Sequence, residues 1–271
     1  MLEIFSYPFI IRACIVGLLV SLSSALLGVP LVLRRHSMIG DGLSHVGFGA
    51  LSIASVLSLS PMYFTIPVVA LFSVLLLRME DRGSFSDGMT AIISSSSLAF
   101  GTFIVSFVRG TNSDISNFLF GSVLAIGKSD AYLAIVLSIL VLMSFVLLFP
   151  RIFSITFDPE FSKSEGLDYS VYMTILALLT SVTIVLGMRM MGSLLISAVL
   201  VFPALTAIQV AKSFLRMTIL SGVLSIVSFT SGLCLSFYFG TPVGATVVLF
   251  DLVLFIIFHL MAKFPRLSKV H

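Results

Sequence analysis

Asp41 and His45 are the residues of this 271-residue chain whose types and spacing most directly suggest metal chemistry. They are four positions apart, and in a helix this spacing places both side chains on one face, with Cβ atoms about 5–6 Å apart. A carboxylate oxygen and an imidazole nitrogen at that separation can bind one divalent cation. The same pair could instead hydrogen-bond to each other and neutralise two buried polar groups. Two ligands are too few for a stable site, so others would have to come from other segments or a second copy of the chain.

Asp251 and His259 form a second, looser pair, about two helical turns apart. We expect a structural or helix-packing role for both, and the sequence leaves their roles open. Residues 121–129 look like a phosphate-binding loop, but five residues separate the two glycines where that pattern requires four. The sequence also lacks an HExxH motif and a recognisable nucleophile–base pair, so we do not expect an enzyme.

The composition places these residues in a membrane. Hydrophobic residues make up 58% of the chain and charged residues 10%, whereas soluble domains typically have about 45–50% and about 25%. This excludes a soluble enzyme and a nucleic-acid-binding protein, and the net charge of +3 is too small to suggest nucleic acid as a partner. Both cysteines lie inside apolar runs, so we expect neither a disulfide framework nor a CxxC metal site.

The elements that must position Asp41 and His45 are membrane-spanning helices, each needing about 20 largely apolar residues. Nine such runs are present, with eight or ten also possible: 9–33, 37–59, 62–79, 89–108, 130–149, 169–187, 192–211, 214–239 and 242–262. Residues 117–126 are apolar but too short to span, so we expect a loop or a re-entrant helix. Eleven of the fifteen basic residues fall in alternate connections, which predicts an outside N-terminus and a cytoplasmic C-terminus. No cleavable signal peptide is expected, because Glu3 stands where a basic region would and Arg12 lies inside the first apolar run.

The cytoplasmic connection at residues 157–167 has the residue order of a short capped helix. Asp158 suits the N-cap, Pro159 the first helical position, Glu160 the first turn and Gly166 the left-handed position after the last turn. Such a helix could dock a cytoplasmic partner, or it could be a solvated turn.

Three stretches together resemble a known family. Residues 33–45 hold a basic pair followed by Gly-Asp and, four positions after the Asp, a His. Residues 157–166 form the capped stretch, and residues 191–207 hold a Gly-small-Leu-Leu run that ends in Pro-Ala-x-Thr-Ala. With weaker echoes at 118–121 and 241–244, these stretches resemble the permease subunits of metal-ion ABC importers, the zinc and manganese family, over about residues 30–250.

The resemblance implies an all-α polytopic protein with about nine transmembrane helices (eight to ten), like a type II ABC importer permease. Residues 1–271 would form one permease domain, located in the cell membrane. The implied partners are a second copy of the chain (a homodimer) or a close relative, and cytoplasmic ABC ATPase subunits that hydrolyse the ATP. An extracytoplasmic metal-binding protein and membrane lipid are implied as further partners. The chain would bind no cofactor and would transport zinc or manganese.

The resemblance also assigns roles to particular residues. Asp41 and His45 fall on the family's metal-pathway Asp and His. The family's coupling helix, which transmits ATPase closure to the spans, falls on about residues 158–166, with its expected contacts at Asp158, Pro159, Glu160, Phe161 and Gly166.

The chain departs from the family pattern at several positions. Ser122 stands where many relatives carry an acidic residue, and Gly240 where some carry Asp. A serine within 94–97 replaces a histidine that certain zinc members place in the fourth span. Asp and His ligands serve zinc, manganese and ferrous iron alike, so the metal stays open. The alternatives are an ABC permease for a metal chelate, such as haem or a siderophore, and a proton-coupled secondary carrier.

Overall fold

A computed structural model describes residues 8–80, 86–107, 118–121 and 127–267. Its described residues fold into helices connected by short turns and contain no strand. The labelled helices are α1 (Pro8–Leu33), α2 (Ile39–Val56), α3 (Pro61–Glu80), α4 (Ser86–Ser106), α6 (Lys128–Phe157), α7 (Pro159–Ser164), α8 (Tyr169–Met191), α9 (Ile196–Val210), α10 (Phe214–Phe239) and α11 (Val243–Leu267). The all-α fold class is therefore confirmed.

Each of the nine apolar runs forms a helix, and seven of these helices are long and apolar enough to cross a membrane by themselves. The two others are α2 and α9. Helix α2 has 18 residues, but Asp41, His45 and its glycines lower its hydropathy, and α9 has only 15 residues. The expected loop or re-entrant helix at 117–126 lies largely outside the described residues, of which 118–120 are helical.

Several helix boundaries differ from the expected ones, and two of the differences lie at a proline and at a glycine. Helix α6 continues through Pro150 to Phe157, eight residues beyond the expected end at residue 149. Residues 192–195 precede α9 as a turn, because Gly192 ends α8 with a φ of +92° and the helix restarts only at Ile196. In α6 the helix therefore extends past the end of the apolar run, whereas at α9 the apolar run begins before the helix does.

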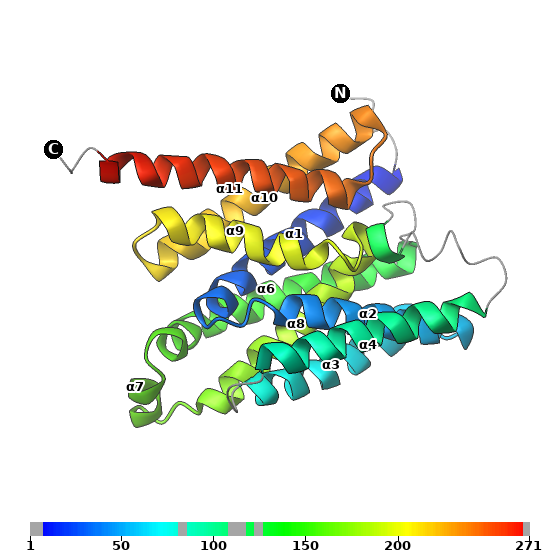
Figure 1. Ribbon diagram of the computed structural model, residues 1–271, viewed down its shortest axis with the longest axis horizontal. Coiled ribbons are helices and arrows are strands. Elements are labelled where there is room, and N and C mark those ends of the chain that lie inside the picture. The colour runs from blue at the N-terminus through cyan, green and yellow to red at the C-terminus, as the bar shows by residue number, and fades with distance from the viewer. Residues whose placement is uncertain (1–7, 81–85, 108–117, 122–126, 268–271) are drawn as a thin grey trace.

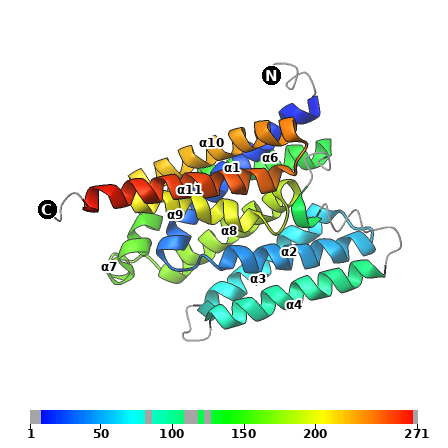
Figure 2. The same cartoon turned by 45° about the horizontal axis from the view of Figure 1, so that its top comes forward.

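Helices α1 and α8 lie in the interior of the bundle, with most of each span buried (Figure 1). Helix α1 packs against α6, α8, α9 and α10, while α2, α3 and α4 form a group to one side (Figure 2). Small residues permit close approach: the hydroxyl groups of Ser21 on α1 and Ser225 on α10 are 2.5 Å apart, and both side chains are buried. Helices in lipid associate through such packing and interhelical hydrogen bonds.

The ends of the bundle carry different segments. Helix α7 and the end of α11 lie at one end, and α1 begins at the opposite end (Figure 1). An odd number of crossings places the two termini at opposite ends in this way. The predicted topology puts the C-terminus in the cytoplasm, so we call the α7 end the inner end.

The turn between α8 and α9 is recessed from the outer end of the bundle. Gly187 packs against Val20, which lies at the middle of α1, and α8 ends only four residues later, about 6 Å along its axis. Non-helical backbone at membrane depth must be buried in protein and hydrogen-bonded. Here the amides of Ser193 and Leu194 donate to the carbonyls of Phe118 and Leu119, at 3.0 and 3.2 Å. The 118–121 segment thus completes the backbone of the recessed turn.

Candidate functional site

The structure brings Asp41 and His45 together on one face of α2, as their spacing predicts. Asp41 lies in the first turn, where the positive end of the helix dipole favours a carboxylate. Its Oδ1 is 3.6 Å from Nε2 of His45, too long for a good hydrogen bond. The His45 side chain is 9% exposed and that of Asp41 is 41% exposed. The two groups therefore face each other without forming a good hydrogen bond to each other.

The other ring nitrogen of His45 points into the protein. Its Nδ1 is buried and has no hydrogen-bond partner among the described residues. A buried polar atom without a partner costs free energy, so such an atom needs an explanation. A ligand that orders the imidazole, or a change in helix packing that supplies a partner, would remove this cost.

Helix α4 adds a hydroxyl to the pair. The Oγ of Ser94 donates to Oδ2 of Asp41 at 3.5 Å, at the long limit of a hydrogen bond. Close packing of α2 against α4 makes this possible: a Cβ at Gly49 would lie 3.0 Å from the carbonyl oxygen of Ser97, and a Cβ at Gly101 would collide with the Phe48 ring. Ser94 is one of the serines at 94–97, the stretch in which certain zinc members of the resembled family have a histidine.

A groove of about 440 Å³ leads to Asp41 between the start of α2 and the face of α9. Its lining residues are Ser37, Met38, Asp41, Ser197, Ala198, Val201, Phe202 and Leu205. Asp41 is the one ionisable residue among them. The groove therefore presents a single carboxylate, backed by His45, on a mostly apolar path.

The described residues contain no group of three or more His, Cys, Asp or Glu side chains placed to hold a metal ion. The part of the chain that the structure describes thus offers two candidate ligands, Asp41 and His45, and one serine hydroxyl at this position. A metal with four ligands would need additional ones from outside that part.

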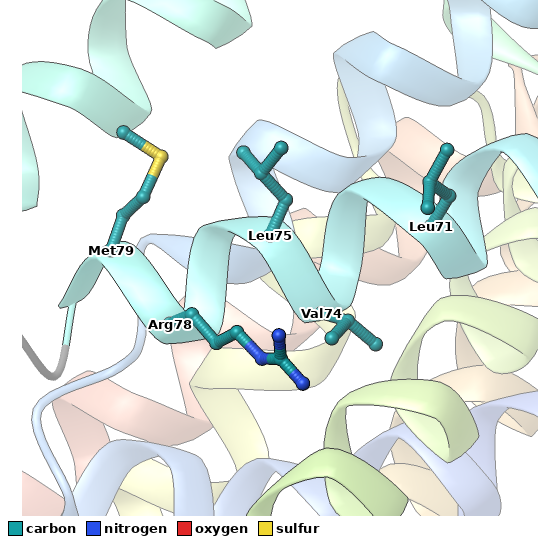
Figure 3. Close-up of a pocket in the computed structure, with 5 residues that line it drawn as sticks. All are labelled: Leu71, Val74, Leu75, Arg78 and Met79. Atoms are coloured by element: carbon teal, nitrogen blue, oxygen red, sulfur yellow. The ribbon is translucent and has the colours of Figure 1, made fainter.

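A second hollow, of about 500 Å³, lies along α3, and none of its lining residues is a His, Cys, Asp or Glu that could bind a metal ion. All of its lining residues come from α3: Leu71, Val74, Leu75, Arg78 and Met79 (Figure 3). In that view Leu71, Leu75 and Met79 point to one side of the helix, and Arg78 points away from them. A single apolar helix face with a cation near its inner end is what a lipid-facing span presents.

The predicted capped helix is present as α7. Asp158 is its N-cap: the Oδ1 atom accepts the Phe161 amide at 2.9 Å, and Pro159 occupies the first helical position. Gly166 has a φ of +81°, and the Leu167 amide donates to the Ser162 carbonyl at 2.9 Å to close the helix. The sequence rules for helix ends therefore predicted this element correctly.

Helix α7 is held on one side and free on the other. The Ser162 hydroxyl is buried and lies 2.7 Å from that of Ser154 on α6. Glu160 and Phe161 are exposed, and Phe161 projects a large aromatic ring with 55% exposure. An exposed aromatic beside a carboxylate at the inner end is a surface that a cytoplasmic protein could cover.

Asp251 and His259 do not join the Asp41 site in the structure. Asp251 is buried on α11, and its Oδ2 has no hydrogen-bond partner among the described residues. His259 lies two turns further along α11, where its Nδ1 is 3.0 Å from Oε1 of Gln209 on α9. The two residues therefore have separate surroundings, and His259 links α9 to α11.

The sequence reasoning missed an ion pair at the outer end. Asp130 in the first turn of α6 pairs with Arg189 in the last turn of α8. A carboxylate near a helix N-terminus and a cation near a helix C-terminus are each favoured by the helix dipole, and this was the available signal. Which acid meets which base depended on how α6 and α8 pack.

Comparisons with known proteins agree with this geometry. Residues 6–262 match the model of the ABC 3 transport family. The chain is 30% identical to the high-affinity zinc uptake system membrane protein ZnuB of Haemophilus influenzae, over 93% of this chain and 97% of that protein. It is 27% identical to the manganese import system permease protein ScaB of Streptococcus gordonii, over 97% and 95%. It also resembles the solved structure of PsaBC from Streptococcus pneumoniae in complex with Fab, with a TM-score of 0.83 and 26% identity, over 93% of this chain and 91% of that one.

Proposed function

The chain belongs to the ABC 3 transport family, and we propose that it is the permease subunit of an ATP-driven importer of zinc or manganese ions. Its apolar helices make it a multi-pass protein of the plasma membrane, and it acts as a transport subunit and not as an enzyme. The relatives named for zinc uptake and for manganese import support a transition-metal ion as the cargo. We treat residues 1–271 as a single permease domain.

One observation carries the assignment of the pathway: the Asp41 carboxylate and the His45 imidazole face each other, 3.6 Å apart, at the groove between α2 and α9. Neutral imidazole and carboxylate are ligands that zinc, manganese and ferrous iron all accept. The unpartnered Nδ1 of His45 and the long contact to Asp41 leave this pair free to reorganise around an ion.

A second copy of the chain would complete the coordination. One chain supplies one carboxylate and one imidazole, and two copies related by a two-fold axis would supply four ligands. The exposure of Asp41 and the open groove support this arrangement, because a ligand turned toward a partner is exposed in a single chain. We propose a homodimer, or a pair with a close relative, embedded in lipid.

The two ends of the bundle would meet different partners. We propose that cytoplasmic ABC ATPase subunits, which hydrolyse the ATP, cover α7. They would contact Asp158, Pro159, Glu160, Phe161 and Gly166. The exposed Phe161 ring and the rigid cap at Asp158 support this role. An extracytoplasmic metal-binding protein would deliver the ion at the opposite end.

The test is metal accumulation in a host that lacks its own high-affinity uptake. The chain is expressed with its cognate ATPase and binding protein, and cellular zinc, manganese and iron are measured by mass spectrometry. Wild type is compared with Asp41→Asn and, as a control, with Asp251→Asn, which changes a buried aspartate away from the groove.

Each result of this test has a definite meaning. Accumulation of one metal that is lost in Asp41→Asn and kept in Asp251→Asn would identify the cargo and support the pathway. Accumulation that survives Asp41→Asn would keep the importer and reject the pathway. No accumulation of any metal by an assembled complex would contradict the proposed cargo and favour a metal chelate or a proton-coupled carrier.

A further inference from the structure

Arg34 lies where the α1–α2 connection meets the two chain segments that flank α7. It directly follows the last residue of α1, and its own amide donates to the Pro30 carbonyl at 3.0 Å. The next residue, Arg35, has a φ of +64°, and the His36 amide returns to the Leu31 carbonyl at 2.8 Å. The backbone at Arg34 is therefore held firmly against the end of α1.

The Arg34 side chain fills a need created by Pro159. The carbonyl of Ile155 in the last turn of α6 would normally accept from the amide four residues later, but that residue is Pro159, which has no N–H. Nη2 of Arg34 donates to this carbonyl at 2.5 Å, and Ile155 is fully buried. The first residue of α7 thus leaves an acceptor that Arg34 satisfies.

The same guanidinium also lies on an aromatic ring beyond α7. Its Cζ is 5.1 Å from the ring centroid of Tyr169, the first residue of α8. A planar guanidinium can donate a hydrogen bond and stack on an aromatic face at once, which a lysine ammonium cannot do equally well. Arg34 therefore contacts the chain on both sides of α7, before Asp158 and after Gly166.

The path from Arg34 to Asp41 is short and hydrogen-bonded. Four residues separate Arg34 from Ile39, where α2 begins, and Asp41 lies in the first turn of α2. The Ile39 amide donates to the His36 carbonyl at 3.2 Å, and the Gly42 amide donates to the Met38 carbonyl at 3.1 Å. A displacement at Arg34 therefore reaches the first turn of α2 through a connection with little slack.

We propose that Arg34 transmits the movement of α7 to the Asp41 end of α2, so that movement at the ATPase contact changes the metal site. It acts as a positioning residue: it contacts neither the metal nor the ATPase in this role. This inference rests on the proposed function, because it requires α7 to be moved by an ATPase. It goes further by naming the contact that links α7 to Asp41.

The chain contains a matched control for this contact. Cζ of Arg151 on α6 lies 5.7 Å from the ring centroid of Tyr172 on α8, so it joins the same two helices by the same kind of interaction. Arg151 does not belong to the α1–α2 connection. Loss of Arg151 tests the effect of weakening the α6–α8 junction, and loss of Arg34 adds the loss of the link to α2.

The experiment uses the complete transporter, with permease, ATPase and binding protein, reconstituted in liposomes. ATP hydrolysis and uptake of radioactive zinc or manganese are measured together for wild type, Arg34→Gln and Arg151→Gln. We expect Arg34→Gln to raise the ATP hydrolysed per ion transported by about tenfold, a size typical of altered coupling between sites. Arg151→Gln is expected to leave this ratio unchanged.

Other results would overturn the proposal. It is wrong if Arg34→Gln lowers hydrolysis and uptake in equal proportion, or if Arg151→Gln raises the ratio to the same extent. Should Arg34→Gln fail to assemble, Tyr169→Leu removes the other half of the contact and Tyr169→Phe retains the ring; the ratio must rise in the first and stay unchanged in the second. Absence of metal uptake by the wild-type complex would instead refute the proposed function.

Discussion

Gly121 and Gly192 lie back to back, with φ angles of +79° and +92°, and neither has room for a side chain. A Cβ on Gly121 would lie 2.5 Å from the Gly192 amide nitrogen, and a Cβ on Gly192 would lie 2.7 Å from that of Gly121. The contact holds the 118–121 segment against the recessed turn between α8 and α9. Both residues need glycine for two independent reasons, the backbone angle and the space.

The Gly121–Gly192 contact predicts a large loss of stability in Gly192→Ala. The positive φ alone costs about 1–3 kcal/mol for a residue with a Cβ, and the collision with the 118–121 segment adds to it. Gly240→Ala is the control, because Gly240 also has a positive φ of 65° but no atom lies within 4 Å of its Cβ position. Thermal unfolding of the two purified variants should show a clearly lower midpoint for Gly192→Ala, and equal midpoints would contradict the predicted collision.

The position of Ser94 beside Asp41 leads us to predict a higher metal affinity in the variant Ser94→His. The serine hydroxyl lies 3.5 Å from the Asp41 carboxylate, so an imidazole at this position could add a third ligand to Asp41 and His45. We expect zinc to bind about tenfold more tightly, equivalent to about 1.4 kcal/mol, and to leave more slowly. The affinity is measured by equilibrium zinc binding to the purified permease. The control is Ser96→His, because Ser96 lies nearby on α4 and is exposed. Unchanged affinity in Ser94→His would show that α4 does not border the ion.

The N-cap of α7 predicts weaker assembly in Asp158→Ala. Asp158 accepts the Phe161 amide, and loss of such a cap typically costs about 1 kcal/mol of helix stability. Asp158→Asn preserves a capping acceptor and is expected to behave like wild type. The measurement is the affinity of the permease in detergent for its purified ATPase, which should fall about fivefold in Asp158→Ala. Equal weakening in both variants would instead point to a direct role of the negative charge.

The outer ion pair predicts a mutual dependence between Asp130 and Arg189. The Arg189 side chain is 12% exposed and that of Asp130 is 31% exposed, so removing one leaves the other partly buried without its partner. Asp130→Asn and Arg189→Gln are each expected to lower the unfolding midpoint, whereas the double variant should lose less than the sum of the two. Additive losses in this cycle would mean that the pair contributes no coupling energy.

We expect the variant Asp251→Asn to keep metal transport. Its Oδ2 is buried with no hydrogen-bond partner in the described chain, so Asp251→Asn removes a carboxylate that is poorly compensated. We expect an unchanged or higher unfolding midpoint and an unchanged pH dependence of metal uptake. A shifted pH profile in Asp251→Asn would instead favour the proton-coupled carrier.

The sequence alone predicted most features that depend on one helix. The nine apolar runs correspond to the observed helices because each is defined by local hydrophobicity and helix signals. The face shared by Asp41 and His45 follows from the 3.6-residue period, and the ends of α7 follow from Asp158, Pro159 and Gly166. These features need only the geometry of a short stretch of backbone.

The tertiary structure decided the features that join distant helices. Ser94 reaches Asp41 across 53 positions, Arg34 reaches Ile155 across 121, and Asp130 meets Arg189 across 59. The depth of the turn after Gly192 likewise depends on how far α8 extends beside α1. In lipid, helices associate through the fit of small residues and interhelical hydrogen bonds, and apolar content does not specify which helices meet. The sequence alone therefore determined the helices and the pairing of Asp41 with His45, whereas only the packing of the helices determined which residues surround that pair.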